Sequence, residues 1–228
     1  MATISDKLQL VGGRIRAAVS QFARPEGSVT LLAVSKTFPA ATIREAVAAG
    51  QHRFGENYVQ EALDKMAELA DLREQIEWHM IGPIQSNKTR AVAEHFDWVH
   101  TVDRLKIAQR LNDQRPDHLP PLQVCVQVNT SGEESKSGIA PDEALALARE
   151  VADLPRLRLR GVMALPAPSA NPAEQSRQLA AVRAVYEDLR AQGLPLDTLS
   201  MGMSSDLEAA VAQGSTMVRV GTALFGQR

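Results

Sequence analysis

The chain has 228 residues, of which 44% are apolar and 23% charged, with a formal net charge of −2. These values are ordinary for a soluble globular protein, and the near-neutral charge gives no electrostatic reason to expect a nucleic acid or an anionic membrane as partner. The one cysteine, Cys125, excludes an intrachain disulfide, so a reducing, cytoplasmic location is expected.

Residues 1–19 carry apolar side chains at three- or four-residue steps, which predicts an amphipathic helix. The segment lacks the long apolar core and the small-residue cleavage site of a signal peptide. Because no run of about 18 apolar residues follows, a membrane-spanning helix is not expected.

Short apolar runs then alternate with longer helical patterns along the rest of the chain. Runs rich in Val, Leu and Met without polar alternation are typical of strands covered on both faces, as in parallel sheets. The eight runs span residues 29–36, 52–55, 76–82, 98–102, 122–129, 159–165, 198–204 and 217–224.

Eight strand-then-helix units in this length predict an α/β fold, a (β/α)8 (TIM) barrel with an extra N-terminal helix. A doubly wound open sheet uses the same units and is the alternative, although no GxGxxG sequence follows the first strand. No linker or low-complexity tract interrupts the pattern, so residues 1–228 are expected to form a single domain. Barrels of this type place their sites at the carboxyl ends of the strands.

Lys36 is an unexpected residue at the end of the first predicted strand. It shares a face with Leu32 and Val34, which points its amine into the barrel mouth. Partial desolvation there lowers the pKa of a lysine and favours Schiff-base formation with an aldehyde. When this strand is considered alone, a lysine at its end more often reaches solvent or pairs with a carboxylate than acts as a nucleophile.

Arg219 lies within the last apolar run, where a buried guanidinium needs an acceptor. A carboxylate and a ligand are both possible acceptors. Ser204 follows the seventh run, and Gly221 and Thr222 follow the eighth. Because this fold often binds phosphate after these two strands, the three residues are phosphate-binding candidates.

The other polar residues in the apolar runs are less informative. Asn57 after the second run is compatible with a simple turn. His79 is expected to be a hydrogen-bonded core histidine, and Cys125 an inert buried thiol. The five histidines show no metal-ligand spacing with Cys125, so no metal site is predicted.

Five segments carry a resemblance that covers the chain from the first strand onwards. They are AVSKTFP, FGENYVQE, WHMIGPIQSNK, VNTSGEESKSGI and LSMGMSSDLEAAVAQGSTMVRVGTALFG. Together they resemble the pyridoxal-phosphate homeostasis protein family. The resemblance implies a barrel like the N-terminal domain of alanine racemase (fold type III), with pyridoxal 5′-phosphate (PLP) at its mouth.

The resemblance also implies roles for individual residues. Lys36 matches the lysine that holds PLP covalently as an internal aldimine, and Arg219 the arginine that faces the pyridine nitrogen. Ser204 resembles the phosphate-binding serine, assisted by the backbone at Gly221 and Thr222.

Three further positions are placed by the same resemblance. Asn57 matches a residue close to the cofactor, and Met203 one that lines its pocket. Ser205 stands where many members carry an acidic residue, which leaves the local charge open while phosphate binding is expected to be retained.

An arginine only donates hydrogen bonds, so it keeps the pyridine nitrogen unprotonated and weakens the ring as an electron sink. Racemases with this arrangement are similar in using a tyrosine base from a separate C-terminal domain. This sequence ends at Arg228 with only Tyr58 and Tyr186, neither placed like that base. The resemblance therefore implies a PLP-binding protein of intracellular vitamin B6 homeostasis without efficient catalysis, and no catalytic residue is expected.

PLP is the expected partner, with apo forms of PLP-dependent enzymes as candidate transient acceptors, and the chain is expected to be a monomer. Lys136 could assist release if its loop folds over the barrel mouth, although a solvated loop lysine is commoner. A PLP-dependent amino-acid racemase is the alternative function. A Schiff-base aldolase for a phosphorylated sugar is a third, weaker one.

Overall fold

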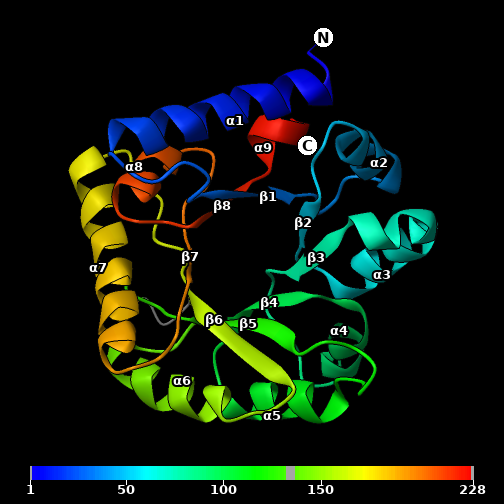
Figure 1. Cartoon of the computed structure of the whole chain (residues 1–228), viewed down its shortest axis with the longest axis vertical. Helices are drawn as coiled ribbons and strands as arrows, with labels where there is room; N and C mark the ends of the chain where they lie inside the picture. Colours follow the sequence, from blue (N-terminus) through cyan, green and yellow to red (C-terminus); the bar gives the residue numbers. More distant parts are fainter. Residues whose placement is uncertain (1, 132–136, 227–228) are drawn as a thin grey trace.

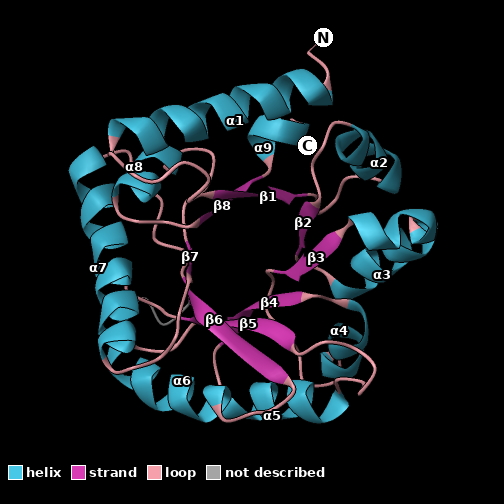
Figure 2. Ribbon diagram, viewed as in Figure 1, coloured by secondary structure: helices cyan, strands magenta, loops and turns pink. Residues whose placement is uncertain are grey.

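The computed structural model describes residues 2–131 and 137–226, which form a closed parallel barrel surrounded by helices (Figures 1 and 2). The strands pair in chain order, and β8 pairs back onto β1. They are β1 (Thr30–Val34), β2 (Arg53–Glu56), β3 (Glu77–Met80), β4 (Trp98–Val102), β5 (Leu122–Gln127), β6 (Leu157–Met163), β7 (Thr198–Ser200) and β8 (Met217–Val220). The predicted (β/α)8 barrel is confirmed, and ring closure excludes the open sheet.

Helices follow the strands and cover the outside of the barrel (Figure 2). They are α1 (Ile4–Gln21), α2 (Ala40–Ala48), α3 (Val59–Glu68), α4 (Thr89–His95), α5 (Leu105–Gln114), α6 (Ala144–Ala152), α7 (Pro172–Ala191), α8 (Leu207–Ala212) and α9 (Thr222–Phe225), with 3₁₀ helices η1 (Ala70–Gln75) and η2 (Pro141–Glu143). The extra helix α1 begins at a capping box formed by Thr3 and Asp6, and it packs against α8 and α9. The predicted N-terminal helix is therefore confirmed.

Six strands end earlier than the sequence predicts, among them β1, β7 and β8, which end at Val34, Ser200 and Val220. After β7, Gly202 adopts φ +95°, a left-handed conformation that turns the chain away from the sheet. After β8, the chain enters α9 almost at once. Because β1 ends at Val34, Lys36 lies in a turn just beyond this strand rather than in the strand itself.

Buried apolar side chains form one large core between the barrel wall and the helices. Two smaller clusters are separate from it, one around Leu32 and Met217 and one of Trp98, Cys125 and Met163. Strand alternation places both clusters inside the barrel. Cys125 is fully buried there, and burial raises the pKa of its thiol to about 12, so it is the inert thiol that the sequence predicts.

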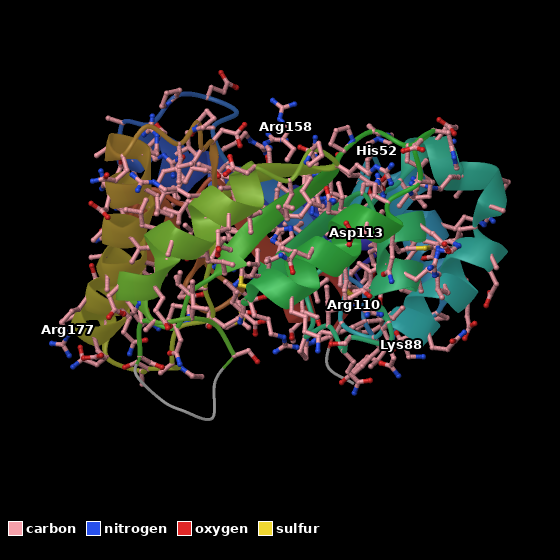
Figure 3. All side chains as sticks on the ribbon, turned by 90° about the horizontal axis from the view of Figure 1, so that it is seen from below. His52, Lys88, Arg110, Asp113, Arg158 and Arg177 are labelled. Atoms are coloured by element: carbon pink, nitrogen blue, oxygen red, sulfur yellow. The ribbon has the colours of Figure 1, made fainter. Side chains whose placement is uncertain are left out.

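Charged side chains project from the outer surface around the molecule, as Arg158 and Arg177 illustrate (Figure 3). Arg160 instead lies over the ring of Trp98, 4.7 Å from its centroid, and pairs with Asp197 at 2.7 Å. These contacts fill the amino-terminal end of the barrel. None of the helices formed by the described residues has the length and apolar character needed to cross a membrane.

Candidate functional site

A cavity of about 810 Å³ lies at the carboxyl ends of the strands. This volume is within the range of small-molecule sites. All seven residues singled out from the sequence line it: Lys36, Asn57, Met203, Ser204, Arg219, Gly221 and Thr222. Arg219 of β8 and residues just beyond the carboxyl ends of β1, β2, β7 and β8 are therefore brought together, as the barrel rule predicts.

An apolar part of the cavity wall was missed by the sequence analysis. It consists of Phe38, Ile81 and Leu165, which follow β1, β3 and β6. Each lies just beyond the carboxyl end of its strand, and this position in the sequence is the signal that identifies it as a candidate for the cavity wall. A flat aromatic ligand could pack against these side chains.

The turn that carries Lys36 has an unusual backbone conformation. Thr37 adopts φ +68°, which is rare for a β-branched residue. Its N–H donates a hydrogen bond to Oε1 of Glu61 on α3, and the N–H of Phe38 donates to the carbonyl of Ser35 at 3.0 Å. The structure around the turn therefore holds a conformation that the local sequence disfavours, a feature that is common near functional sites.

A buried ionic cluster lies directly behind this turn. Nζ of Lys65 donates to the Ser35 carbonyl at 2.9 Å, to Oε1 of Glu56 at 2.8 Å and to Oε1 of Glu61 at 2.6 Å. Lys65 is 5% exposed and Glu56 fully buried. Burial raises the pKa of the Glu56 carboxyl, although Lys65 and the Ser35 hydroxyl oppose that shift. Because Ser35 belongs to the turn, this cluster ties Lys36 to α3.

Arg219 is 4% exposed and lines the cavity from β8. Its Nη1 donates to the carbonyl and the hydroxyl of Ser200, both at 2.7 Å, and Nη2 donates to the Ala164 carbonyl at 2.8 Å. Within the described residues its acceptors are carbonyl and hydroxyl oxygens, so of the two possible acceptors the carboxylate is not found there. Burial lowers the pKa of the guanidinium to about 10, and it stays charged at neutral pH.

A guanidinium has five N–H donors. Three hydrogen bonds to protein oxygens leave the N–H of Nε and one N–H of Nη2 without an acceptor in the described part of the chain. A buried charge with unused donors at the wall of a cavity suits an acceptor atom on a ligand.

The segments after β7 and β8 also line the cavity. Arg14 of α1 donates to the Ser204 carbonyl at 3.1 Å and pairs with Glu208 at 2.8 Å, which fixes this loop from outside. The N–H of Met203 donates to Asp206 at 2.6 Å. The Ser204 hydroxyl makes no hydrogen bond to any described residue, so it can bind an anion.

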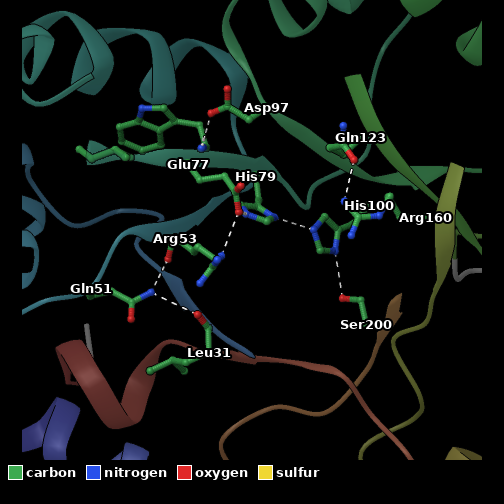
Figure 4. Close-up of polar contacts among 12 residues, drawn as sticks. Leu31, Gln51, Arg53, Glu77, His79, Asp97, His100, Gln123, Arg160 and Ser200 are labelled. Carbon is green, nitrogen blue, oxygen red and sulfur yellow. Dashed lines mark hydrogen bonds and ion pairs between the residues drawn. The ribbon is translucent and has the colours of Figure 1, made fainter. Parts of the chain in front are cut away.

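Two histidines lie inside the barrel below the cavity. His79 and His100 are fully buried and 2.9 Å apart between Nδ1 and Nε2, and His79 also contacts Glu77 (Figure 4). The prediction that His79 is a hydrogen-bonded core histidine is confirmed. No group of metal-binding side chains occurs in the ranges 2–131 and 137–226.

The buried histidines make stability depend on pH. Burial lowers the pKa of both, that of His100 well below its ordinary value. The unfolded chain binds these protons near pH 6.5, so their stabilisation is fully present above that pH and is lost as the pH falls. We expect the free energy of unfolding to drop by up to about 1.4 kcal/mol per pH unit for each histidine.

Urea unfolding at several pH values between about 7.5 and 5 measures this slope. His100→Phe should reduce it, whereas replacement of the exposed His95 by Gln should not. Equal stability across this range would contradict the burial of two neutral histidines.

The fold and the cavity define a class of single-barrel proteins with an amine, a buried guanidinium and an anion-binding loop at the barrel mouth. A family model described as alanine racemase, N-terminal domain, matches residues 13–228. The pyridoxal phosphate homeostasis protein of Pseudomonas aeruginosa is 61% identical over all of this chain and 97% of its own length. That of Escherichia coli K12 is 55% identical over 100% of this chain and 98% of its own. The chain belongs to the pyridoxal phosphate homeostasis protein family.

Solved structures agree with this assignment to the family. PipY of Synechococcus elongatus, determined with PLP bound, is 41% identical and superposes with a TM-score of 0.84 over 98% of this chain and all of its own. Alanine racemase from Corynebacterium glutamicum is 20% identical, with a TM-score of 0.68 over 94% of this chain and 60% of its own. The racemase likeness shows the fold alone.

Proposed function

We propose that this chain is a PLP-binding protein that acts in vitamin B6 homeostasis, with residues 1–228 as one cofactor-binding barrel domain. The name of the two curated relatives and the PLP bound to PipY support this function. The single observation that carries it is that a lysine, a buried arginine with unused donors and a serine hydroxyl line one cavity.

Each of these groups suits one part of PLP. The amine of Lys36 condenses with the aldehyde to form a Schiff base and release water. Arg219 donates an N–H to the pyridine nitrogen. Ser204 binds the phosphate with the backbone at Gly221 and Thr222, while Asn57 and Met203 lie against the rest of the cofactor.

The same arrangement argues for holding the cofactor rather than turning over a substrate. Arg219 stays charged, so it leaves the pyridine nitrogen unprotonated and the ring a weak electron sink. Tyr186 of α7 is buried, with its hydroxyl donating to the Leu196 carbonyl, and Tyr58 is 57% exposed outside the cavity lining. Neither tyrosine is placed as a base for α-proton removal.

In this function the protein keeps the reactive aldehyde bound in the cytoplasm as a monomer and transfers it to apo enzymes. The position Lys136, considered for assisting release, lies outside the described residues. An incoming amine can displace Lys36 by exchange at the Schiff-base carbon.

Titration with PLP and with pyridoxal, which lacks the phosphate, tests the proposal. We expect PLP to bind with a yellow absorbance band and pyridoxal to bind more weakly, because only PLP reaches Ser204. The racemase alternative predicts rapid deuterium exchange at the α-carbon of L-alanine with formation of D-alanine. A colourless protein that takes up no PLP would overturn the proposal, and robust exchange would favour the racemase.

A further inference from the structure

A chain of buried hydrogen bonds runs from Arg219 through the barrel interior to its amino-terminal end. Arg219 contacts the hydroxyl of Ser200 at 2.7 Å, Ser200 contacts Nδ1 of His100 at 2.9 Å, and Nε2 of His100 contacts Nδ1 of His79 at 2.9 Å. Nε2 of His79 contacts Oε1 of Glu77 at 2.9 Å (Figure 4). Strands β8, β7, β4 and β3 each contribute to it.

The donors in this chain all point the same way. Glu77 as a carboxylate only accepts, so Nε2 of His79 donates to it, and the neutral ring of His79 accepts at Nδ1 from Nε2 of His100. Neutral His100 in turn accepts at Nδ1 from the hydroxyl of Ser200, whose oxygen accepts from Arg219. A cation therefore stands at one end and a carboxylate at the other.

The carboxylate end is at the surface. The side chain of Glu77 is 37% exposed, and Nε of Arg53 donates to it at 3.0 Å. Partial burial alone would raise the pKa of Glu77, but the hydrogen bond from His79 and the charge of Arg53 outweigh it and lower the pKa to about 2. Glu77 is thus a charged acceptor at the far end of the chain, where it also pairs with Arg53.

The stability of the barrel does not require a chain of polar side chains in its interior. The inside of such a barrel is usually filled by branched apolar side chains. Replacing buried polar chains by apolar residues of similar volume is often neutral or stabilising. Aligned hydrogen bonds also polarise one another, so the chain places negative potential on Ser200 Oγ, where it contacts Arg219.

We propose that Ser200, His100, His79 and Glu77 are positioning residues for Arg219 that fix its guanidinium at the cavity wall with two N–H donors left for a ligand. They thereby determine how strongly Arg219 binds the ring nitrogen of PLP. This inference rests on the proposed function. None of the four residues except Ser200 contacts Arg219, and none lines the cavity.

The test compares PLP with its 1-deaza analogue, in which carbon replaces the ring nitrogen while the aldehyde and phosphate remain. The ratio of the two Kd values isolates the contact at the ring nitrogen, and a general loss of structure weakens both ligands equally. In the wild-type protein we expect a preference for PLP of about tenfold or more, as a hydrogen bond from a charged donor provides.

The variants are His100→Phe, which interrupts the chain, and Glu77→Gln, which keeps the volume but removes the remote charge. We expect His100→Phe to lower the preference by about tenfold and Glu77→Gln by about threefold, with little change in the Kd of the analogue. His100→Gln, whose amide can accept and donate, should restore part of the preference. Cys125→Ala, a buried barrel position outside the chain, is the matched control and should retain it.

An unchanged preference in both His100→Phe and Glu77→Gln would overturn the inference while leaving PLP binding intact. Equal weakening of both ligands would also overturn it, because the residues would then be merely structural. If His100→Phe does not fold, Glu77→Gln at the surface decides the question. A wild-type protein that binds neither ligand would reject the proposed function itself.

Discussion

Replacing Lys65 with methionine is expected to lower the free energy of unfolding by about 3–5 kcal/mol at neutral pH, the cost of leaving one partner of a buried ion pair uncompensated. Lys65 pairs with Glu56 at 2.8 Å, and both side chains are almost completely buried. The loss removes the anchor of the turn that carries Lys36, because Lys65 also holds the Ser35 carbonyl. Urea unfolding measures the effect.

The destabilisation should become smaller as the pH falls towards 5. Without Lys65 the pKa of the buried Glu56 rises further, so the folded variant binds a proton that the unfolded chain releases, and acid favours the folded form. Lys106→Met, an exposed lysine on α5, is the matched control and should change stability by less than about 0.5 kcal/mol. Equal effects of the two substitutions would contradict the role of Lys65.

Replacing Lys36 with alanine is expected to abolish the Schiff base that PLP forms with this residue in the cavity. No other lysine of the described residues lines the cavity, so none can form the Schiff base in its place. Ser204 and Arg219 should still hold some PLP without a covalent bond, and its spectrum should resemble that of the free aldehyde. Absorbance titration separates the two modes of binding.

The control for this substitution is Lys106→Ala, which leaves the cavity untouched. It should bind PLP with the wild-type spectrum and affinity. A PLP adduct in Lys36→Ala that borohydride fixes covalently to the protein, or the absence of such an adduct in Lys106→Ala, would contradict the assignment of Lys36.

The barrel and the residues that line its cavity could be predicted from the sequence, because both depend on short-range patterns. Alternation along the predicted first strand puts Lys36 on the inward face with Val34, and both line the cavity although β1 ends at Val34. The rule that sites lie at carboxyl strand ends groups Lys36 with Ser204 and Arg219. The ends of strands were less predictable. The left-handed conformation of Thr37 is held by Glu61 from another element, and its own sequence gives no sign of it.

The supporting residues could not be read from the sequence. Lys65 occupies a helix position that looks like an ordinary solvated face, and only the folded structure buries it beside Glu56 of β2. The partners of Arg219 likewise depend on barrel register, because Ser200 and His100 come from strands distant in the chain. A pattern within one strand carries no information on such contacts.

The most direct measurement is borohydride reduction of the PLP-loaded protein, followed by peptide mapping with mass spectrometry. Reduction converts a Schiff base into a stable secondary amine and fixes the cofactor to the lysine that held it. The proposed function predicts loss of the yellow band and a phosphopyridoxyl label on Lys36. A label on other lysines but not on Lys36, or no label on a protein that remains yellow, would contradict it.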